Sequence, residues 1–334
     1  NVKEYIVPFK ELKFFEDSFY NDPELKVHER YDSTLLMKFE AKNKNPIAYL
    51  VKEFEMKKKA AELRRVTVSD TGTLDTNKLH TYKFNDDIFR KIGAVADGKN
   101  HGIVMFIDWS GSMADNMSGT IEQLITMSTF CRKVNIPFDV YAFSTEYRKK
   151  LIDRPNQSID MEPNQLDIDY FSLMNILSSS MKNQTYRKFA NDLLNVADAY
   201  KPYTNYRRNY KTNYIIEGMG LGGTPLNATI QVASNVVNDF RKRTRSEIVN
   251  VIFLTDGEDS STLWTTSSDN RGTRIGPSDF RSVSYIEDKE SAKTYRVSDK
   301  GVTPTLLQIL KDRTGCNLIG FYILPKSKSY FQNA

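Results

Sequence analysis

Two apolar segments, each followed by an aspartate, constrain the fold of this 334-residue chain more than any other feature. Residues 102–107 read Gly-Ile-Val-Met-Phe-Ile and lead into Asp108, and residues 248–255 lead into Asp256. Short continuous apolar runs of this kind are typical of strands buried on both faces of a parallel sheet. The two segments therefore predict buried strands that each deliver a carboxylate at their carboxyl end.

From about residue 100 onward, strand-like and helix-like segments alternate. A further strand is expected at 138–144 and a closing strand at 317–324, with helices near 119–134, 185–199, 227–241 and 303–313. This alternation predicts an α/β fold, a doubly wound and mainly parallel sheet covered by helices on both faces. Ligands bind such sheets at the carboxyl ends of strands, where the strand order reverses. Asp108 and Asp256 both fall at ends of this kind.

The chain divides into a mainly helical N-terminal extension, residues 1–100, and an α/β domain, residues 101–326. In the extension, apolar residues three and four apart predict a helix from Pro46 that continues through a basic stretch to Arg65. Two insertions interrupt the domain. The one near 145–184 is interpreted as a polar loop. The insertion near 257–300 directly follows Asp256. Two interpretations of it remain, a lid or partner-contacting segment and a plain surface loop.

Composition narrows the class of protein. Hydrophobic residues make up 40% and aromatic residues 12%, enough for a sizeable core. A net charge of +5 does not by itself indicate nucleic-acid binding, and no nucleic-acid partner is expected. No apolar stretch approaches the roughly 18 residues of a membrane span, and no secretory signal opens the sequence, so a cytoplasmic protein is the default. Cys131 and Cys316 are expected to be buried free thiols.

Side-chain oxygens are concentrated around the two aspartates. Residues 108–112 read Asp-Trp-Ser-Gly-Ser, so one carboxylate and two hydroxyls, those of Ser110 and Ser112, follow the first strand. Thr224 follows Gly222-Gly223 and could supply a third hydroxyl. Hard oxygen ligands suit Mg²⁺, which keeps part of its coordination shell for water or other ligands. The competing interpretation is that Asp108 merely caps the following helix.

Other motifs carry weaker signals. Residues 218–223 match Gly-x-Gly-x-x-Gly, but the strand before them is weak, and a metal loop explains the glycines better than a dinucleotide. Residues 203–211 contain aromatic and basic residues interleaved, for which a protein contact or a solvated loop is favoured over single-stranded nucleic acid. The basic run 241–245 is interpreted as the end of a helix. The sequence contains no zinc spacing, no Gly-x-Ser-x-Gly and no Walker A motif, so no catalysis is expected of the chain alone.

Together, Asp-x-Ser-x-Ser, Gly-Gly-Thr-Pro and Leu-Thr-Asp-Gly resemble the metal-ion-dependent adhesion site of von Willebrand factor A domains. The resemblance implies that Asp108, Ser110, Ser112 and Thr224 surround a divalent metal, and that Asp256 acts nearby, often through water. The implied metal is Mg²⁺, with Mn²⁺ as an alternative. The implied partner is a protein client that coordinates the metal through a carboxylate.

The segment before the metal-bearing strand resembles the lead-in of CobT-type cobaltochelatase subunits. It contains Arg64-Arg65, then Gly-Thr-Leu-Asp at 72–75, Leu79, and a charged, Phe-containing piece at 86–91. Residues 82–89 and 108–113 are most similar to CobT-like proteins of tailed bacteriophages. This resemblance implies partnership with a MoxR/CobS-type AAA+ ATPase. The sequence departs from bacterial chelatase subunits in having no long acidic linker before the A domain.

We therefore expect a non-catalytic, metal-dependent adaptor for such an ATPase, in a chelatase-like or remodelling complex. One alternative is a genuine cobaltochelatase subunit, which takes part in ATP-driven metal insertion into a tetrapyrrole. The other is a structural or virion-associated adhesion module that works without a motor.

Overall fold

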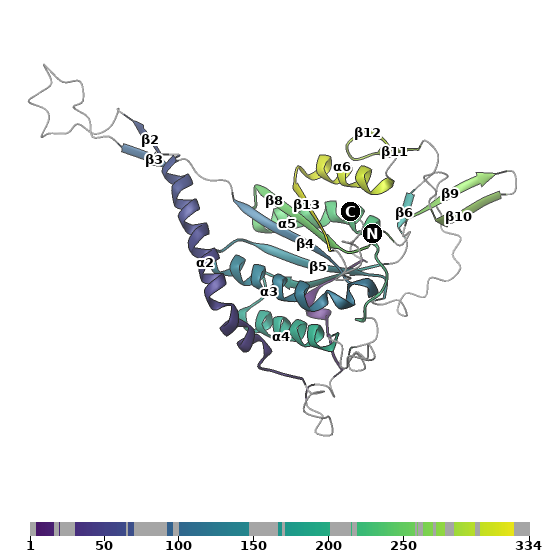
Figure 1. Ribbon diagram of the computed structural model, residues 1–334. Helices are drawn as coiled ribbons and strands as arrows, with labels where there is room; N and C mark the ends of the chain where they lie inside the picture. Colours follow the sequence, from purple (N-terminus) through teal and green to yellow (C-terminus); the bar gives the residue numbers. More distant parts are fainter. Residues whose placement is uncertain are drawn as a thin grey trace, which may run out of the picture.

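A six-stranded sheet forms the central layer of the protein (Figure 1). The computed structural model describes residues 5–16, 20, 31–64, 66–69, 92–95, 100–146, 166–168, 171–200, 215, 219–257, 259, 263–269, 272–277, 284–297 and 301–323. The strands lie in the order β1-β7-β5-β4-β8-β13. Their bounds are Ile6–Val7 (β1), His101–Asp108 (β4), Phe138–Ser144 (β5), Ser172–Ser178 (β7), Ile248–Thr255 (β8) and Asn317–Tyr322 (β13). Neighbouring strands are parallel except β5 and β7, which are antiparallel.

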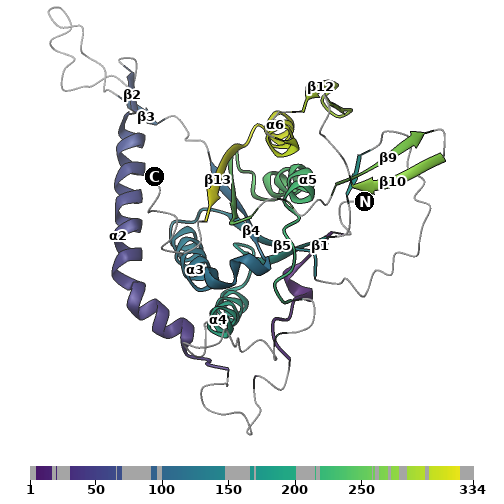
Figure 2. The same ribbon diagram turned by 45° about the vertical axis from the view of Figure 1, so that its right-hand side comes forward.

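Helices cover both faces of this sheet (Figures 1 and 2). The five α-helices within the described residues are α2 (Leu35–Arg64), α3 (Met117–Lys133), α4 (Asn183–Ala199), α5 (Leu226–Thr244) and α6 (Val302–Thr314). Met105 and Ile107 of β4 pack in one apolar cluster with α3 and α4, whereas Val104 and Phe106 pack in another with α5 and α6. Burial on both faces explains why the strand sequence is apolar without alternation. None of the described helices is both long and apolar enough to cross a membrane.

The mixed α/β class and the mostly parallel sheet are thus confirmed. Strands expected at 102–108, 138–144 and 248–255 and the helices of the sheet domain begin and end within three residues of their expected positions. Cys131 and Cys316 are buried and free, as the sequence predicted.

The interpretation of residues 145–184 as a polar loop is wrong for its second half. This stretch contains β7, whose seven residues are all buried, and the start of α4. Leu173 packs in the cluster beneath α5 and α6, while Met174 and Ile176 pack in the cluster beneath α3 and α4. The segment therefore supplies a buried strand to the sheet, between β1 and β5.

Strands lie within residues 257–300, for which the sequence did not decide between a lid and a surface loop. β9 (Leu263–Asp269) and β10 (Gly272–Pro277) form an antiparallel pair, and β6 (Leu166–Ile168) pairs with β9. β11 (Tyr285–Asp288) and β12 (Lys293–Arg296) form a second antiparallel pair. Arg313 of α6 holds this pair through a hydrogen bond from its Nε to Asp288 Oδ2, 3.0 Å long.

The N-terminal region contributes to the sheet as well as to the helical layer. β1 pairs in parallel with β7, so residues near the start of the chain form one edge of the central layer. α2 begins at Leu35, eleven residues before the expected start at Pro46, and its far end meets the β2–β3 pair (Val66–Ser69 and Ile92–Val95; Figure 1). The division near residue 100 stays a prediction, and residues 70–91, which carry most of the CobT resemblance, lie outside the described residues.

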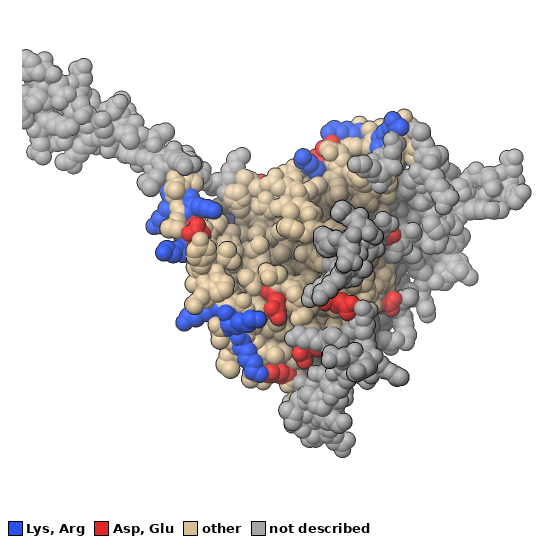
Figure 3. Space-filling view, viewed as in Figure 1, with Lys and Arg blue, Asp and Glu red and all other residues tan. Residues whose placement is uncertain are grey.

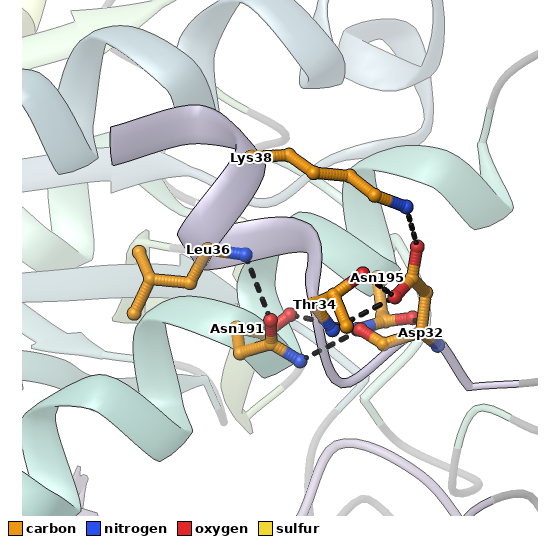
Figure 4. A network of polar contacts seen from close by, with 6 residues as sticks. All are labelled: Asp32, Thr34, Leu36, Lys38, Asn191 and Asn195. Carbon is orange, nitrogen blue, oxygen red and sulfur yellow. Dashed lines mark hydrogen bonds and ion pairs between the residues drawn. The ribbon is translucent and has the colours of Figure 1, made fainter. Parts of the chain in front are cut away.

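Two asparagines of α4 fix the start of α2 (Figure 4). Asn191 Oδ1 accepts the backbone N–H of Leu36 at 2.9 Å, and Asn191 Nδ2 donates to the carbonyl of Asp32 at 2.9 Å. Asn195 Oδ1 accepts the N–H of Asp32 at 2.9 Å. The first amides of a helix have no partner within the helix, so Asn191 supplies an acceptor for the Leu36 amide, while both asparagines hold Asp32 just before the helix.

Candidate metal site

The candidate site lies where the strand order reverses. From β4 the chain continues to β5 on one side, whereas β8 pairs with β4 on the other side. Asp108 is the last residue of β4, and Asp256 directly follows β8. The two carboxylates therefore project from adjacent parallel strands at the position where open α/β sheets bind ligands.

Asp108 is fully buried, with an exposed fraction of 0%. Its Oδ2 accepts a hydrogen bond of 2.6 Å from the hydroxyl of Thr255, but its buried Oδ1 has no hydrogen-bond partner. Burial raises the pKa of Asp108 to about 6, because the charged form loses its hydration. A buried carboxylate oxygen without a partner is costly unless a cation is present, so this residue fits a metal ligand.

Ser110 and Ser112 connect this carboxylate to the second one. The Oγ atoms of Ser110 and Ser112 lie 2.9 Å apart. Ser112 Oγ also donates a hydrogen bond of 2.6 Å to Asp256 Oδ1. The two serines and Asp256 thus form a continuous row of oxygens beside Asp108.

Thr224 completes the group from a third part of the chain. A methyl group placed on Gly257 would lie 3.6 Å from Thr224 Oγ1 and 3.8 Å from Ser112 Oγ. Both hydroxyls therefore border the same glycine, directly after Asp256. All five residues singled out from the sequence come together at one end of the sheet.

The glycine loop that carries Thr224 is attached directly to the loop after β4. Gly222 forms a parallel bridge with Ser110, in which Gly111 N–H donates to Gly222 O at 2.9 Å and Gly222 N–H donates to Trp109 O at 3.0 Å. The bulky Trp109 is buried and donates from Nε1 to the carbonyl of Met219 at 2.9 Å. These bonds hold Thr224 in register with the serines.

A glycine is required at position 222 by close packing. A Cβ there would lie 2.5 Å from Glu146 Cγ and 2.7 Å from Ser144 Oγ. Both distances are far shorter than a carbon contact of about 3.5–4.0 Å. Gly222 is thus explained by its approach to the end of β5, although the part of the Gly-x-Gly-x-x-Gly motif before Met219 lies outside the described residues.

The alternative in which Asp108 caps the next helix is wrong. α3 begins at Met117, and its N-cap residue is Asn116 rather than Asp108. The short 3₁₀ helix at Gly111–Asp115 begins after Ser110, which makes no side-chain capping bond. Asp108 is therefore available to other groups.

Sequence reasoning missed two contributors to the site. Thr255 was included only as the end of a strand, yet its hydroxyl is the hydrogen-bond donor to Asp108. Asp259 accepts the backbone N–H of Asn227 at 2.8 Å, which connects the loop after β8 to the start of α5. The Thr-Asp-Gly motif was the one sequence signal that could have indicated a role for Thr255. Nothing local in the sequence indicates the partner of Asp259.

The donor set is suited to a hard cation. Among the described residues, no three His, Cys, Asp or Glu side chains gather in one place, so a metal here would depend on hydroxyl oxygens beside the two carboxylates. Carboxylate and hydroxyl oxygens favour Mg²⁺ over softer metals. The residues present therefore fit a magnesium ion.

Comparisons with known proteins add little to this geometry. No protein-family model matches the chain, and no curated protein matches it. A crystal structure of the pilus adhesin SpaC from Lactobacillus rhamnosus GG, in an open conformation, is similar over 70% of this chain, with 14% sequence identity and a TM-score of 0.38. The chain spans about a quarter of that adhesin, since the match covers 25% of it. A similarity this distant carries no argument about function.

Proposed function

We propose that this chain is a von Willebrand A-type domain that binds Mg²⁺, and that it works as a non-catalytic adaptor between a MoxR/CobS-type AAA+ ATPase and a protein client. The main support for this proposal is that five oxygen-bearing residues from three distant segments converge at the point where the strand order reverses. The buried, unpartnered Oδ1 of Asp108 lies within that group. A helix cap or a chance polar cluster would not require this combination.

In this proposal, Asp108, Ser110, Ser112 and Thr224 hold the metal, and Asp256 orients the site through its hydrogen bond with Ser112. A bound Mg²⁺ would supply a Lewis-acidic point of attachment for a carboxylate of the client. The chain's own residues fix the position of that attachment, because β4, β8 and the glycine loop are tied to one another by backbone hydrogen bonds. Mn²⁺ is the alternative occupant with similar oxygen preferences.

The assignment to the CobT branch rests on the resemblance of residues 64–91. The same resemblance supports the AAA+ ATPase as partner, because CobT-type subunits work beside such motors. The chain itself carries no Walker A motif, so ATP hydrolysis is assigned to the partner.

The proposal is tested in two steps on the full chain. Isothermal titration with MgCl₂ is expected to show one site in the wild type and none in Asp108→Ala. Asp239→Ala is the matched control, since it removes an exposed carboxylate of α5. Equal Mg²⁺ binding by Asp108→Ala and the wild type would contradict the metal site.

The second step is a pull-down from native lysate with Mg²⁺ or EDTA. Capture of an AAA+ ATPase by the wild type in Mg²⁺, lost in EDTA and in Asp108→Ala, is the expected result. Equal capture of the ATPase in EDTA and by Asp108→Ala would contradict a metal-dependent adaptor. Addition of a tetrapyrrole and a cobalt salt to the captured complex separates an adaptor from a genuine cobaltochelatase subunit, because only the latter would insert metal. Copurification with assembled particles independently of ATP would instead indicate an adhesion module.

A further inference from the structure

Thr224 is buried, yet its hydroxyl has no hydrogen bond that holds it in place. The residue is 7% exposed, and within the described part of the chain its side chain makes no hydrogen bond. Its carbonyl accepts the N–H of Leu226 at 2.9 Å, a bond to a residue only two positions away. The position of the hydroxyl beside Gly257 therefore depends on how the backbone before and after Thr224 is fixed.

The backbone before Thr224 is fixed by the end of β5. Gly223 N–H donates a hydrogen bond of 2.8 Å to Oγ1 of Thr145. Thr145 directly follows Ser144, the last residue of β5. The bonded positions are 78 residues apart, so this contact ties the glycine loop to a strand that is distant in the sequence.

The backbone after Thr224 is fixed by the loop that follows β8. Asn227 N–H donates a hydrogen bond of 2.8 Å to Oδ1 of Asp259. Asn227 lies in the first turn of α5, where the amides have no partner within the helix. The N-cap residue of α5, Pro225, makes no side-chain capping bond, so Asp259 supplies this partner from another segment. A carboxylate is also favoured at a helix N-terminus by the helix dipole.

The two bonds come from either side of Asp108. Both β5 and β8 pair in parallel with β4, which ends at Asp108. The carboxyl ends of the three strands therefore lie at one edge of the sheet, with the end of β4 in the middle. Thr145 holds the glycine loop from the β5 side, and Asp259 holds the start of α5 from the β8 side.

We propose that Thr145 and Asp259 are positioning residues for the metal site, which act by holding the hydroxyl of Thr224 toward the metal. Their role rests on the proposed function, because a fixed Thr224 matters for Mg²⁺ only if its hydroxyl is a ligand. Groups that orient metal ligands from behind commonly contribute about 10–100-fold to metal affinity. Neither residue belongs to the Asp-x-Ser-x-Ser, Gly-Gly-Thr-Pro or Leu-Thr-Asp-Gly motif, so the site extends beyond the residues that those motifs indicate.

The first test removes and restores the acceptor at position 145. Thr145→Val keeps the shape of the side chain but leaves Gly223 N–H without its acceptor, and Mg²⁺ binding to the full chain is expected to weaken about tenfold. Thr145→Ser retains a hydroxyl, so its affinity should stay within about twofold of the wild type, well inside that effect. Isothermal titration with MgCl₂ measures each affinity.

The second test separates the hydrogen bond of Asp259 from its charge. Asp259→Ala removes both, and about a tenfold loss of Mg²⁺ affinity is expected. Asp259→Asn removes the charge but keeps an oxygen that can accept the N–H of Asn227, and Asn is as effective as Asp at a helix N-terminus. Asp259→Asn should therefore retain most of the affinity that Asp259→Ala loses.

A double-mutant cycle tests whether Thr145 acts through Thr224. Thr224→Ala removes the hydroxyl that Thr145 is proposed to position. In this background Thr145→Val should have no further effect on Mg²⁺ affinity, because the effects of residues that act as one unit are not additive. A general loosening of the domain would instead reduce the affinity equally in both backgrounds.

Ser179→Ala is the matched control. Ser179 Oγ accepts the N–H of Phe138 at 3.1 Å, a bond of the same kind at the opposite end of β5. Its removal should leave Mg²⁺ affinity unchanged. Acidic side chains are present at several separate places on the described surface (Figure 3), and surface carboxylates can also bind Mg²⁺. The binding that remains in Asp108→Ala is therefore taken as the background, and urea unfolding establishes that every variant is folded.

Failure of the metal site and failure of the positioning role give different results. A wild type that binds no more Mg²⁺ than Asp108→Ala contradicts the proposed function and, with it, any role of these residues in metal binding. A wild type that binds Mg²⁺, with Thr145→Val and Asp259→Ala binding it equally well, overturns the positioning role alone. The positioning role is also overturned if Thr145→Ser or Asp259→Asn fails to retain affinity, or if Thr145→Val is equally harmful in both backgrounds.

Discussion

The hydroxyl of Ser112 donates a hydrogen bond of 2.6 Å to Oδ1 of Asp256, although 144 residues separate the two positions. This contact connects the loop after β4 with the loop after β8, at the ends of adjacent strands. It also orients the Asp256 carboxylate toward the group of oxygens around Asp108. The geometry of the candidate site therefore depends on a bond between two loops rather than on either loop alone.

Ser112→Ala is expected to weaken Mg²⁺ binding at least tenfold. The free energy of unfolding should change by less than about 1 kcal/mol, because Ser112 is exposed and water partly replaces its hydrogen bond to Asp256. Titration calorimetry with MgCl₂ and urea unfolding measure the two quantities. Ser118→Ala of α3 is the control, a serine outside the candidate site. Unchanged Mg²⁺ affinity in Ser112→Ala would remove Ser112 from the proposed ligand set.

Gly222→Ala is expected to disturb both folding and metal binding. Its Cβ would approach Glu146 Cγ to 2.5 Å and the backbone nitrogen of Glu146 to 3.1 Å, so the loop that carries Thr224 must shift. Overpacking of this kind typically costs about 1–3 kcal/mol. Chemical unfolding checks the loss of stability, and Mg²⁺ titration checks the displacement of Thr224.

Gly220→Ala is the matched control for that substitution. Gly220 lies two residues earlier in the same loop, and a Cβ there meets nothing within 4 Å. We expect near wild-type stability and Mg²⁺ affinity. Equal effects of the two substitutions would mean that general loop stiffness, rather than the contact with Glu146, explains the glycine.

The sequence predicted what is encoded locally. The apolar runs before Asp108 and Asp256 are continuous segments, so both strands and both carboxylates could be placed correctly. The hydrogen bond from Thr255 to Asp108 joins residues 147 positions apart and depends on β8 lying beside β4. Strand order is a property of the whole fold, and no local pattern encodes it.

The same limit explains two other differences. The basic residues at the end of α5 were correctly interpreted as a helix terminus, but Arg243 also pairs with the buried Asp139 of β5, which is 104 residues away. β7 was missed because its apolar residues are mixed with Ser172, Asn175 and Ser178 and follow a long polar stretch. Ser178 donates to Asp139 at 2.6 Å, so this polar residue of β7 has its partner inside the fold. Burial of such residues becomes predictable only when their partners are known.

Acid is expected to weaken the attachment of the β11–β12 pair to α6. The pKa of Asp288 is lowered to about 2, chiefly by the hydrogen bonds from the Arg313 guanidinium. A carboxyl with a folded-state pKa below its unfolded value of about 3.9 stabilises the fold fully above about pH 4, and this contribution is lost as the pH falls toward 2. The contribution is roughly 2 kcal/mol for a shift of this size.

Asp288→Asn measures this contribution. Urea unfolding at a series of pH values is expected to show the variant less stable than the wild type at pH 7, with the difference shrinking between pH 4 and pH 2. Glu287→Gln is the control, since Glu287 is the exposed neighbouring acid on β11. A difference between Asp288→Asn and the wild type that stays constant down to pH 2 would contradict an ionic origin.

The start of α2 is expected to loosen when its partner on α4 is removed. Asn191 accepts the N–H of Leu36 and donates to the carbonyl of Asp32, and Asn191 is itself buried (Figure 4). Asn191→Leu keeps a side chain of similar size but leaves the Leu36 amide without an acceptor, which costs about 1–3 kcal/mol. Hydrogen exchange at the Leu36 amide is then expected to accelerate at least tenfold, because one factor of ten corresponds to about 1.4 kcal/mol.

Asn183→Leu is the appropriate control, because Asn183 lies at the exposed first turn of the same helix. Its effect on the Leu36 amide should be negligible. If Asn191→Leu instead accelerates exchange equally throughout β4 and β5, the substitution has destabilised the whole domain and α2 is not held locally by this side chain. Faster exchange confined to the first turns of α2 would establish that α4 positions the long helix through its asparagines.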